Sequence, residues 1–264
     1  MGYAAETGWR SIVESEDAIP PWRYVEDMLL SRLELILSNI DTNAKPRIFL
    51  TEGRTFRYDI AVTKPYKGTR VSKKPWHYKN LSVFLYDILG AEKVTGIEAD
   101  DRMAIEQTKS NGTTIIVSRD KDLRQVPGWC FSWELGLQPS FGPTVVDKLG
   151  TIALEKRSGK NVIKATGLLS FYAQVLTGDV VDNIPGLPGC GPVAAYDILT
   201  YEDEEYTFED YTLFDRVHDA YQDYYGDDYN NFIHHLLEQG RLVWMTRRLH
   251  PDGSPVLWEI GMEE

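Results

Sequence analysis

The stretch that most strongly indicates the fold and function of this chain is TGDVVDNIPGLPGCGPVAA, at residues 177–195. Asp179 and Asp182 are three residues apart, so on one helical turn both carboxylates would point the same way. The simplest alternative is a helix cap followed by a loop, with two solvated aspartates. Paired carboxylates elsewhere in the chain favour a functional interpretation.

The second half of this stretch predicts a tight turn between two helices. Pro185 ends the first helix, and a second helix is expected over 193–199. Gly186, Gly189 and Gly191 lie between them and allow a close approach of the backbone to another molecule. Backbone N–H groups at such a turn, next to a helix N-terminus, can bind a phosphate. Contacts of this kind hold a nucleic acid in register without discriminating between sequences.

Composition indicates a globular protein of one or two domains. The chain has 264 residues, of which 42% are hydrophobic, and its apolar runs have the length of strands rather than of membrane spans. The first residues, MGYAAETGWR, have neither the basic nor the apolar region of a signal peptide. Cys130 and Cys190 make no disulfide framework. We therefore expect a cytoplasmic protein that does not associate with a membrane.

The charge is strongly polarised along the chain. The net charge is −12, which by itself argues against a nucleic-acid partner. However, residues 54–79 contain eight Lys or Arg residues and a single acid, Asp59, whereas residues 202–228 contain eleven acids and one base, Arg216. The basic stretch could bind phosphates. The acidic stretch is interpreted as a solvated face.

Hydrophobic periodicity predicts an α/β fold. Apolar runs predict strands over 47–51, 93–96, 113–118, 129–133 and 256–258, and helical spacing predicts helices over 22–37, 79–89, 98–107, 168–176 and 229–241. Strands that alternate with helices indicate a mostly parallel central sheet flanked by helices. The pattern becomes mainly helical near residue 168. We therefore predict an α/β domain over 1–167 and a second, mainly helical subdomain over 168–264.

Acidic side chains follow the predicted strands, where the working residues of a parallel sheet gather. Glu52 follows the first strand, and further acids follow the next two strands or lie in the 177–195 stretch: Glu98, Asp100, Asp101, Asp120, Asp122, Asp179 and Asp182. So many carboxylates in one place repel each other unless cations lie among them. Oxygen ligands favour Mg²⁺ or Mn²⁺, and two such ions roughly 3.5–4 Å apart would promote hydrolysis of a phosphodiester. Helix caps and loops are the alternative for any single cluster.

Four motifs resemble the structure-specific 5′ nucleases, the family of flap endonucleases and 5′–3′ exonucleases that includes the 5′ nuclease domains of bacterial DNA polymerase I. They are YKGTR at 66–70, GIEADD at 96–101, SRDKDL at 118–123, and GDVVDNIPG at 178–186 followed by GCG at 189–191. The resemblance covers residues 45–200. It implies a PIN/FEN-like α/β fold, a basic helical arch at about 54–80, and a helix-hairpin-helix-like (H3TH) subdomain at the C-terminal end.

The resemblance also implies roles for individual residues. Lys67 and Arg70 would be catalytic and contact the scissile phosphate. Two Mg²⁺ or Mn²⁺ ions would be bound by Glu52, Glu98, Asp100, Asp101, Asp120, Asp122, Asp179 and Asp182. DNA would be bound by Lys64, Lys73, Lys74, Gly186, Gly189 and Gly191, with a K⁺ ion at the 186–191 hairpin.

Two positions depart from the family pattern. Glu52 stands where the family usually has Asp after its second strand. The family pattern also begins with an apolar strand that ends in Asp, and the sequence after Met1 does not match it. The resemblance therefore implies that the chain starts about 10–20 residues late relative to that pattern.

The expected function is a Mg²⁺-dependent 5′–3′ exodeoxyribonuclease or flap endonuclease that acts as a monomer on DNA with 5′ ends, flaps or junctions. If the chain is phage-encoded, it would act in the host cytoplasm. Two alternatives stay open. One is a DNA-binding relative with impaired catalysis, and the other is an RNase H-like activity on RNA–DNA hybrids, since the sequence does not show whether a 2′-hydroxyl is recognised.

Overall fold

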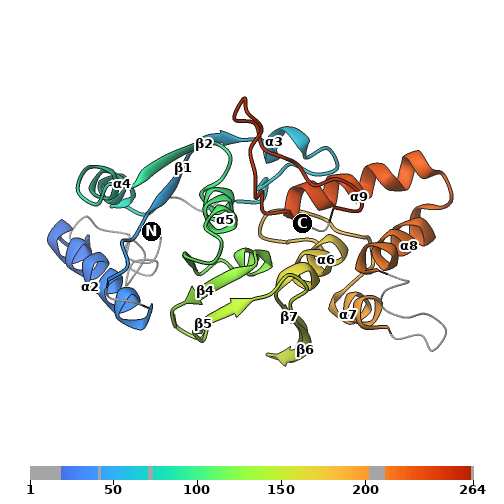
Figure 1. Cartoon of the computed structure of the whole chain (residues 1–264), viewed down its shortest axis with the longest axis horizontal. Helices are drawn as coiled ribbons and strands as arrows, with labels where there is room; N and C mark the ends of the chain where they lie inside the picture. Colours follow the sequence, from blue (N-terminus) through green and yellow to red (C-terminus); the bar gives the residue numbers. More distant parts are fainter. Residues whose placement is uncertain (1–18, 41–42, 71–73, 202–211, 263–264) are drawn as a thin grey trace. The chain divides into compact units, whose positions relative to one another are not determined.

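The computed structural model describes residues 19–40, 43–70, 74–201 and 212–262 (Figure 1). Lys73, which was predicted to bind DNA, lies outside the described residues, as does part of the acidic stretch. The chain folds into two compact units, one made of residues 1–52 and 71–94 and the other of residues 53–70 and 95–264. No helix in the described ranges is long and apolar enough to cross a membrane.

The first unit contains a helical pair that the sequence predicts. Helices α2 (Trp22–Ile40) and α4 (Tyr78–Asp87) have apolar residues at helical spacing. Val25 and Leu29 of α2 share a buried cluster with Leu81, Phe84 and Leu85 of α4. Strands β1 (Phe49–Thr55) and β2 (Glu92–Gly96) pair with each other.

The second unit begins with a small mixed sheet. Strand β3 (Ile115–Val117) pairs in parallel with β4 (Gly128–Ser132), and β4 pairs antiparallel with β5 (Phe141–Val146). Helix α5 (Ala99–Lys109) leads into β3, and a 3₁₀ helix η2 (Lys121–Gln125) follows it. Because α5 packs against the strand that it leads into, the start of α5 and the loop after β3 can present acidic residues at one edge.

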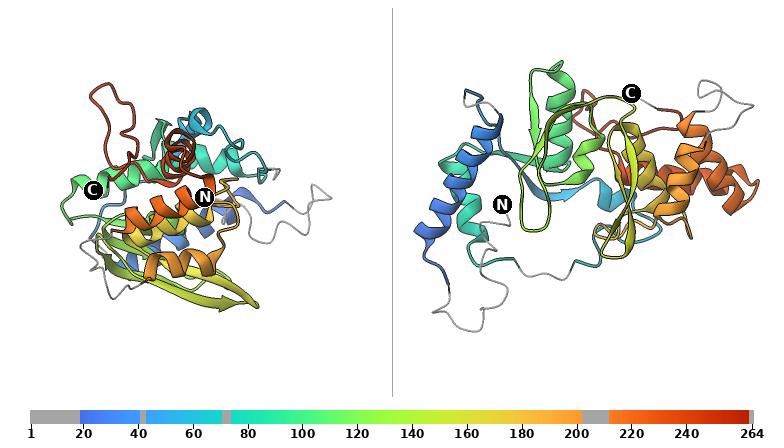
Figure 2. Two further views of the ribbon diagram at one scale, coloured as in Figure 1. Left: turned by 90° about the vertical axis from the view of Figure 1, so that its right-hand side faces the viewer. Right: turned by 90° about the horizontal axis from the view of Figure 1, so that it is seen from below.

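The largest core belongs to the helices that follow. Strands β6 (Ile152–Arg157) and β7 (Lys160–Ala165) form a hairpin that lies against α6 (Gly167–Thr177) and α7 (Pro192–Thr200) (Figure 2). Helices α8 (Leu213–Tyr225) and α9 (Tyr229–Val243) pack onto α6, and the short helix α3 (Arg57–Ile60) contacts α9. Every residue of α6 from Gly167 to Leu176 is buried, so α6 is the central helix of this core.

The predicted α/β class is confirmed, with its strands distributed over three small sheets in the described residues. The strand predicted over 256–258 is wrong, because this segment has no strand and Trp258 instead packs in the core against Phe171, with ring centroids 5.4 Å apart. Gly240 of α9 makes room for the Trp258 ring, since a Cβ there would lie 2.2 Å from a ring carbon. The domain boundary predicted at 167/168 stays a prediction.

The helical turn predicted for Asp179 and Asp182 is also wrong. Helix α6 ends at Gly178, whose φ of +70° is incompatible with its continuation, and residues 179–184 form a closed turn. Asp179 and Ile184 exchange two backbone hydrogen bonds, of 2.9 and 2.8 Å. Gly186 has φ +65°, and a Cβ there would lie 2.3 Å from the backbone nitrogen of Gly178. The close packing of these two glycines fixes the turn on the end of α6.

This packing predicts that Gly186→Ala is far more destabilising than Gly189→Ala. Both glycines have positive φ, so each alanine costs about 1–2 kcal/mol of backbone strain. Only the Gly186 side chain would also collide with backbone, because the space at Gly189 is open. We expect Gly186→Ala to lower the free energy of unfolding by about 3 kcal/mol or more in urea titrations. Equal losses for the two variants would contradict the packing argument.

Candidate functional site

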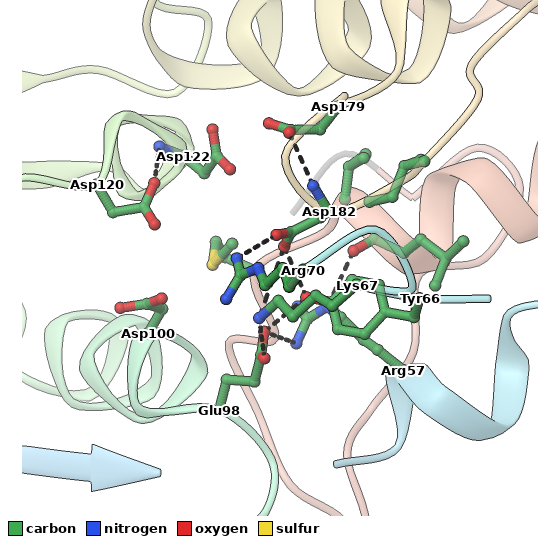
Figure 3. A pocket seen from close by; sticks show the side chains of 14 residues that line it. Arg57, Tyr66, Lys67, Arg70, Glu98, Asp100, Asp120, Asp122, Asp179 and Asp182 are labelled. Atoms are coloured by element: carbon green, nitrogen blue, oxygen red, sulfur yellow. Dashed lines mark hydrogen bonds and ion pairs between the residues drawn. The ribbon is translucent and has the colours of Figure 1, made fainter. Parts of the chain in front are cut away.

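A cavity of about 160 Å³ in the second unit brings acidic and basic side chains together (Figure 3). This volume is enough for several water molecules. The charged or hydroxyl-bearing residues that line it are Arg57, Tyr66, Lys67, Arg70, Glu98, Asp100, Asp120, Asp122, Asp179 and Asp182.

The start of α5 holds the first group of carboxylates. Glu98 is the N-cap residue of the helix, and its backbone N–H donates to Asp101 Oδ2 at 3.0 Å. This capping arrangement fixes the first turn and lets Asp100 face the cavity. Asp101 is fully buried and does not line the cavity. The structure therefore brings Glu98 and Asp100 into the cavity and places Asp101 behind them.

The 3₁₀ helix after β3 holds the second group. Asp120 caps η2, and its Oδ1 accepts a hydrogen bond from the backbone N–H of Asp122 at 3.0 Å. Asp122 Oδ1 in turn accepts from Gln174 Nε2 of α6 at 2.5 Å. Lys121 Nζ lies 3.5 Å from Asp179 Oδ2 and 3.9 Å from Asp122 Oδ1. Gln174 thus orients a carboxylate from a distant part of the chain.

The turn after α6 holds the third group. Asp179 Oδ1 accepts from the backbone N–H groups of Val181 at 2.7 Å and Asp182 at 3.2 Å. These bonds close the turn around the Asp179 side chain, and the Asp182 carboxylate projects toward Tyr66, Lys67 and Arg70 (Figure 3). The two aspartates therefore share one cavity through a turn rather than through helical periodicity.

The segment 62–70 supplies cations to these carboxylates. Lys67 Nζ lies 2.5 Å from Glu98 Oε1 and 3.6 Å from Asp182 Oδ2, and Arg70 donates to Asp182 Oδ1 at 2.5 Å. The Tyr66 hydroxyl lies 2.9 Å from both Glu98 Oε2 and Asp182 Oδ2. Burial, more than these two negative charges, raises the pKa of Tyr66. Tyr66 therefore keeps its proton and links the first and third groups.

Main-chain contacts hold this segment in place. Glu238 of α9 accepts from the backbone N–H groups of Val62 and Thr63, both at 2.7 Å. Asn183 Nδ2 donates to the Pro65 carbonyl at 2.9 Å, and the Lys67 N–H donates to the Asp182 carbonyl at 2.8 Å. Lys67 itself has φ +54°, an uncommon conformation for a residue other than glycine.

Sequence reasoning missed the most buried ion pair of the site. The guanidinium of Arg57 is 1% exposed and binds both oxygens of Asp101, at 2.6 and 2.8 Å. It also donates to the carbonyls of Leu242 and Trp244. Burial alone would lower the pKa of Arg57, but the charge and hydrogen bonds of Asp101 raise it overall. In the sequence, Arg57 is one of eight bases in the 54–79 stretch, and no local pattern indicates that it pairs with Asp101.

Two other carboxylates of the cavity, those of Asp100 and Asp122, have raised pKa values. Burial raises the pKa of Asp100 to about 8, with further contributions from Asp120 and Glu98. Burial and the neighbouring Asp120 raise the pKa of Asp122 to about 7. The cavity thus concentrates carboxylates that are costly to ionise without added positive charge.

This donor set suits hard divalent cations. Among the residues that the structure describes, six carboxylate side chains and no His or Cys line the cavity. Within the described ranges, no three His, Cys, Asp or Glu side chains already converge closely enough to enclose an ion. Glu98 and Asp182 are turned toward Lys67 and Arg70 instead. The residues therefore fit a divalent cation by donor type.

Other predicted site residues are not among those that line the cavity. The Glu52 carboxylate is half-exposed and pairs with Lys93 at 2.9 Å, so it is not among the residues that line the cavity. Lys64 is exposed, and Lys74 Nζ lies 4.0 Å from the centre of the Tyr78 ring. Of the three glycines predicted to bind DNA, Gly186 packs against Gly178. A Cβ added at Gly189 or Gly191 would have no neighbour within 4 Å.

Comparison with known proteins gives three curated relatives, and no protein-family model matches. DNA polymerase I of Rhizobium leguminosarum is 36% identical over 127 residues, which are 46% of this chain and 11% of that protein. A flap endonuclease Xni of Shewanella halifaxensis (strain HAW-EB4) is 27% identical over 155 residues, 56% of either chain. A second Xni, of Shewanella frigidimarina (strain NCIMB 400), is 35% identical over 105 residues, 39% of this chain and 36% of the relative. The matches thus cover at most 56% of the length of these relatives.

Among solved structures, the chain is similar to a crystal structure of the T5 D15 protein co-crystallised with metal ions. The TM-score is 0.47 at 16% identity, over 83% of this chain and 80% of that one.

The buried pair predicts a large stability difference between two arginine variants. Arg57→Met leaves the Asp101 carboxylate buried without its partner and should lower the free energy of unfolding by about 3–5 kcal/mol. Arg54→Met is the matched control, because Arg54 makes an exposed ion pair with Asp59 and its loss should cost less than about 1 kcal/mol. Urea titrations of both variants measure the difference. If Arg57→Met is no worse than Arg54→Met, the buried pair does not stabilise the fold.

Proposed function

Because the chain is related to the structure-specific 5′ nucleases, as its sequence predicted and its curated relatives support, we propose that it hydrolyses phosphodiester bonds of DNA at 5′ flaps or 5′ ends. The observation that carries the proposal is the cavity in which six carboxylates meet Lys67 and Arg70. Carboxylates alone would repel a phosphate, and basic residues alone would bind one without cleaving it. Their combination suits hydrolysis of a phosphodiester assisted by divalent cations.

In this proposal the carboxylates of the cavity hold two Mg²⁺ or Mn²⁺ ions. Glu98 and Asp100 come from the start of α5, Asp120 and Asp122 from η2, and Asp179 and Asp182 from the turn after α6. When bound, the ions would lower the pKa of a water and neutralise charge on the phosphate oxygens. Glu52 and Asp101 are left out of this set, because the first pairs with Lys93 and the second is saturated by Arg57.

The chain's own cations would orient the substrate. Lys67 and Arg70 come from a segment anchored on both α9 and the 179–183 turn, so their charges stay close to the carboxylates. When cations satisfy the carboxylates, these two side chains are available to donate to the phosphate that is attacked and to stabilise its developing charge. Tyr66 would keep Glu98 and Asp182 at a fixed separation.

The duplex would be held beyond the cavity. Gly189 and Gly191 lie just before α7, where a Cβ added to either would have no neighbour within 4 Å, and the first turn of α7 leaves N–H groups without intrahelical partners. We propose that this turn binds backbone phosphates, together with a K⁺ ion, as the resemblance implies. We propose that Lys64, Lys73 and Lys74 also bind DNA, as the resemblance implies.

A second candidate is a protein that binds branched DNA without cleaving it. The observation in its favour is that Glu98 and Asp182 pair with Lys67 and Arg70 rather than converging on an ion position. A labelled 5′-flap substrate separates the two candidates. Cleavage that requires Mg²⁺ or Mn²⁺ and stops with EDTA supports the nuclease, whereas binding without cleavage at any metal concentration supports the second candidate. Parallel RNA–DNA hybrids test the RNase alternative.

The nuclease proposal makes a kinetic prediction for Lys67. Lys67→Met removes a cation that would stabilise charge only as the phosphate reacts, so kcat should fall by about 10²–10³-fold with a smaller change in KM. Lys109→Met, at the exposed end of α5, serves as the control with the same loss of charge. Single-turnover cleavage of the flap substrate gives the rate. A larger effect on KM than on kcat would assign Lys67 to binding instead.

A further inference from the structure

The β6–β7 hairpin has a charge pattern that its fold does not explain. Its two strands pair in register from Ile152 opposite Ala165 to Arg157 opposite Lys160, and Ser158 and Gly159 form the turn. Both turn residues have positive φ, of +48° and +78°, as a tight two-residue hairpin turn requires. The turn is therefore well formed, and the residues that flank it are fixed directly opposite each other.

Those flanking residues, Arg157 and Lys160, carry like charges. Two like charges directly opposite each other on one face destabilise an antiparallel pair. Both residues are exposed, and neither has a carboxylate partner in the described part of the chain. The acids nearest in sequence are already engaged, since Glu155 pairs with Lys164 at 2.7 Å and Asp147 accepts from the Gly150 N–H.

A third basic side chain, Arg124, extends this surface. Its guanidinium lies 4.2 Å from the centre of the Phe141 ring, and its buried Nε has no hydrogen-bond partner among the described residues. The positive charge of Arg157 acts on the guanidinium of Arg124, so Arg124 lies near the hairpin tip.

The position of Arg124 connects this surface to the cavity. Arg124 and Asp122 belong to the same 3₁₀ helix, and Asp122 lines the cavity. A duplex with one phosphodiester in the cavity has a further phosphate for about every 3.4 Å of helix axis along each strand, so its charged backbone extends beyond the cavity. In a chain with 40 acids and 28 bases, an exposed basic tip at this place is best matched by a polyanion that also occupies the cavity.

We propose that the tip of the β6–β7 hairpin is a second phosphate-binding surface for duplex DNA, with Arg157 and Lys160 on the backbone and Arg124 beside them. It rests on the proposed function, because the cavity defines the polyanion. Its residues are different from those of the basic segment 62–70 and of the glycine turn before α7. Its contacts are to phosphates, so they add affinity without sequence preference.

A charge reversal separates binding from stability. Arg157→Glu turns the like-charged pair into an opposite-charged pair, which should raise the midpoint of thermal unfolding by about 1–4 °C. The same change should weaken DNA binding. Lys109→Glu is the matched control, because it changes the charge by the same amount on an exposed helix end without a carboxylate partner among the described residues. A structural role for Arg157 would instead lower both stability and binding.

Binding is measured with fluorescent duplex DNA in EDTA over a series of salt concentrations. For each phosphate that a variant no longer neutralises, the slope of log K against log salt should become shallower by about 0.9. Lys160→Gln and Arg157→Glu should each show this change, and Lys109→Glu should not. The proposal is overturned if the Arg157 and Lys109 variants behave alike, if wild type binds no duplex at any salt concentration, or if Arg157→Glu lowers the unfolding midpoint.

Flap cleavage by wild type with Mg²⁺ is measured in parallel, so that the two proposals can fail separately. If wild type cleaves the flap but the salt slopes of the Arg157 and Lys160 variants equal that of wild type, the hairpin proposal is rejected and the nuclease proposal stands. If the salt slopes of these variants change but wild type does not cleave the flap, the nuclease proposal is rejected and the hairpin remains a DNA-binding surface.

Discussion

The buried ion pair between Arg57 and Asp101 is the contact on which the site depends. Arg57 begins α3, Asp101 lies in the first turn of α5, and the carbonyls of Leu242 and Trp244 that also accept from Arg57 lie at the end of α9 and directly after it. One guanidinium thus joins three segments that are far apart in the sequence. Two charges taken out of water are tolerated only where every polar group is satisfied. This requirement fixes the start of α5, and with it the direction of Asp100 and Glu98.

With that framework fixed, the cavity in front of it has an excess of negative charge. The raised pKa values of Asp100 and Asp122 show the cost of placing carboxylates together away from water. Lys67 and Arg70 offset part of that cost through short ion pairs with Glu98 and Asp182. The same side chains therefore have two possible partners, the carboxylates or a phosphate. In the proposed nuclease, added cations would shift them from the carboxylates to the phosphate, and metal binding would then be coupled to substrate binding.

The sequence predicted those parts of the site that short-range patterns encode. Acids after strands and a glycine-punctuated turn are local signals, and they led to Asp120, Asp122 and Asp179. Arg57 with Asp101, 44 residues apart, and Gln174 with Asp122, 52 apart, depend on tertiary packing that no local pattern contains. The helical turn expected at Asp179 failed for a different reason. The three-residue spacing of the aspartates favours a helical turn, but Gly178 directly after an apolar helix is a C-cap signal, and the helix ends there.

The distribution of charge over the chain also limits where a polyanion can bind. With a net charge of −12, most of the surface repels DNA, and attraction is confined to patches where bases lack acidic partners. An ion-paired arginine such as Arg54 contributes little to such a patch, because Asp59 cancels its charge. Arg157 and Lys160 have no acidic partner among the described residues, so their positive charges are not cancelled in this way. Counting bases along the sequence therefore overestimates the role of the 54–79 stretch, and it gives no special weight to the hairpin, which has only four bases, from Lys156 to Lys164. The pairing of each base, which only the folded chain determines, decides which of them are available to a phosphate.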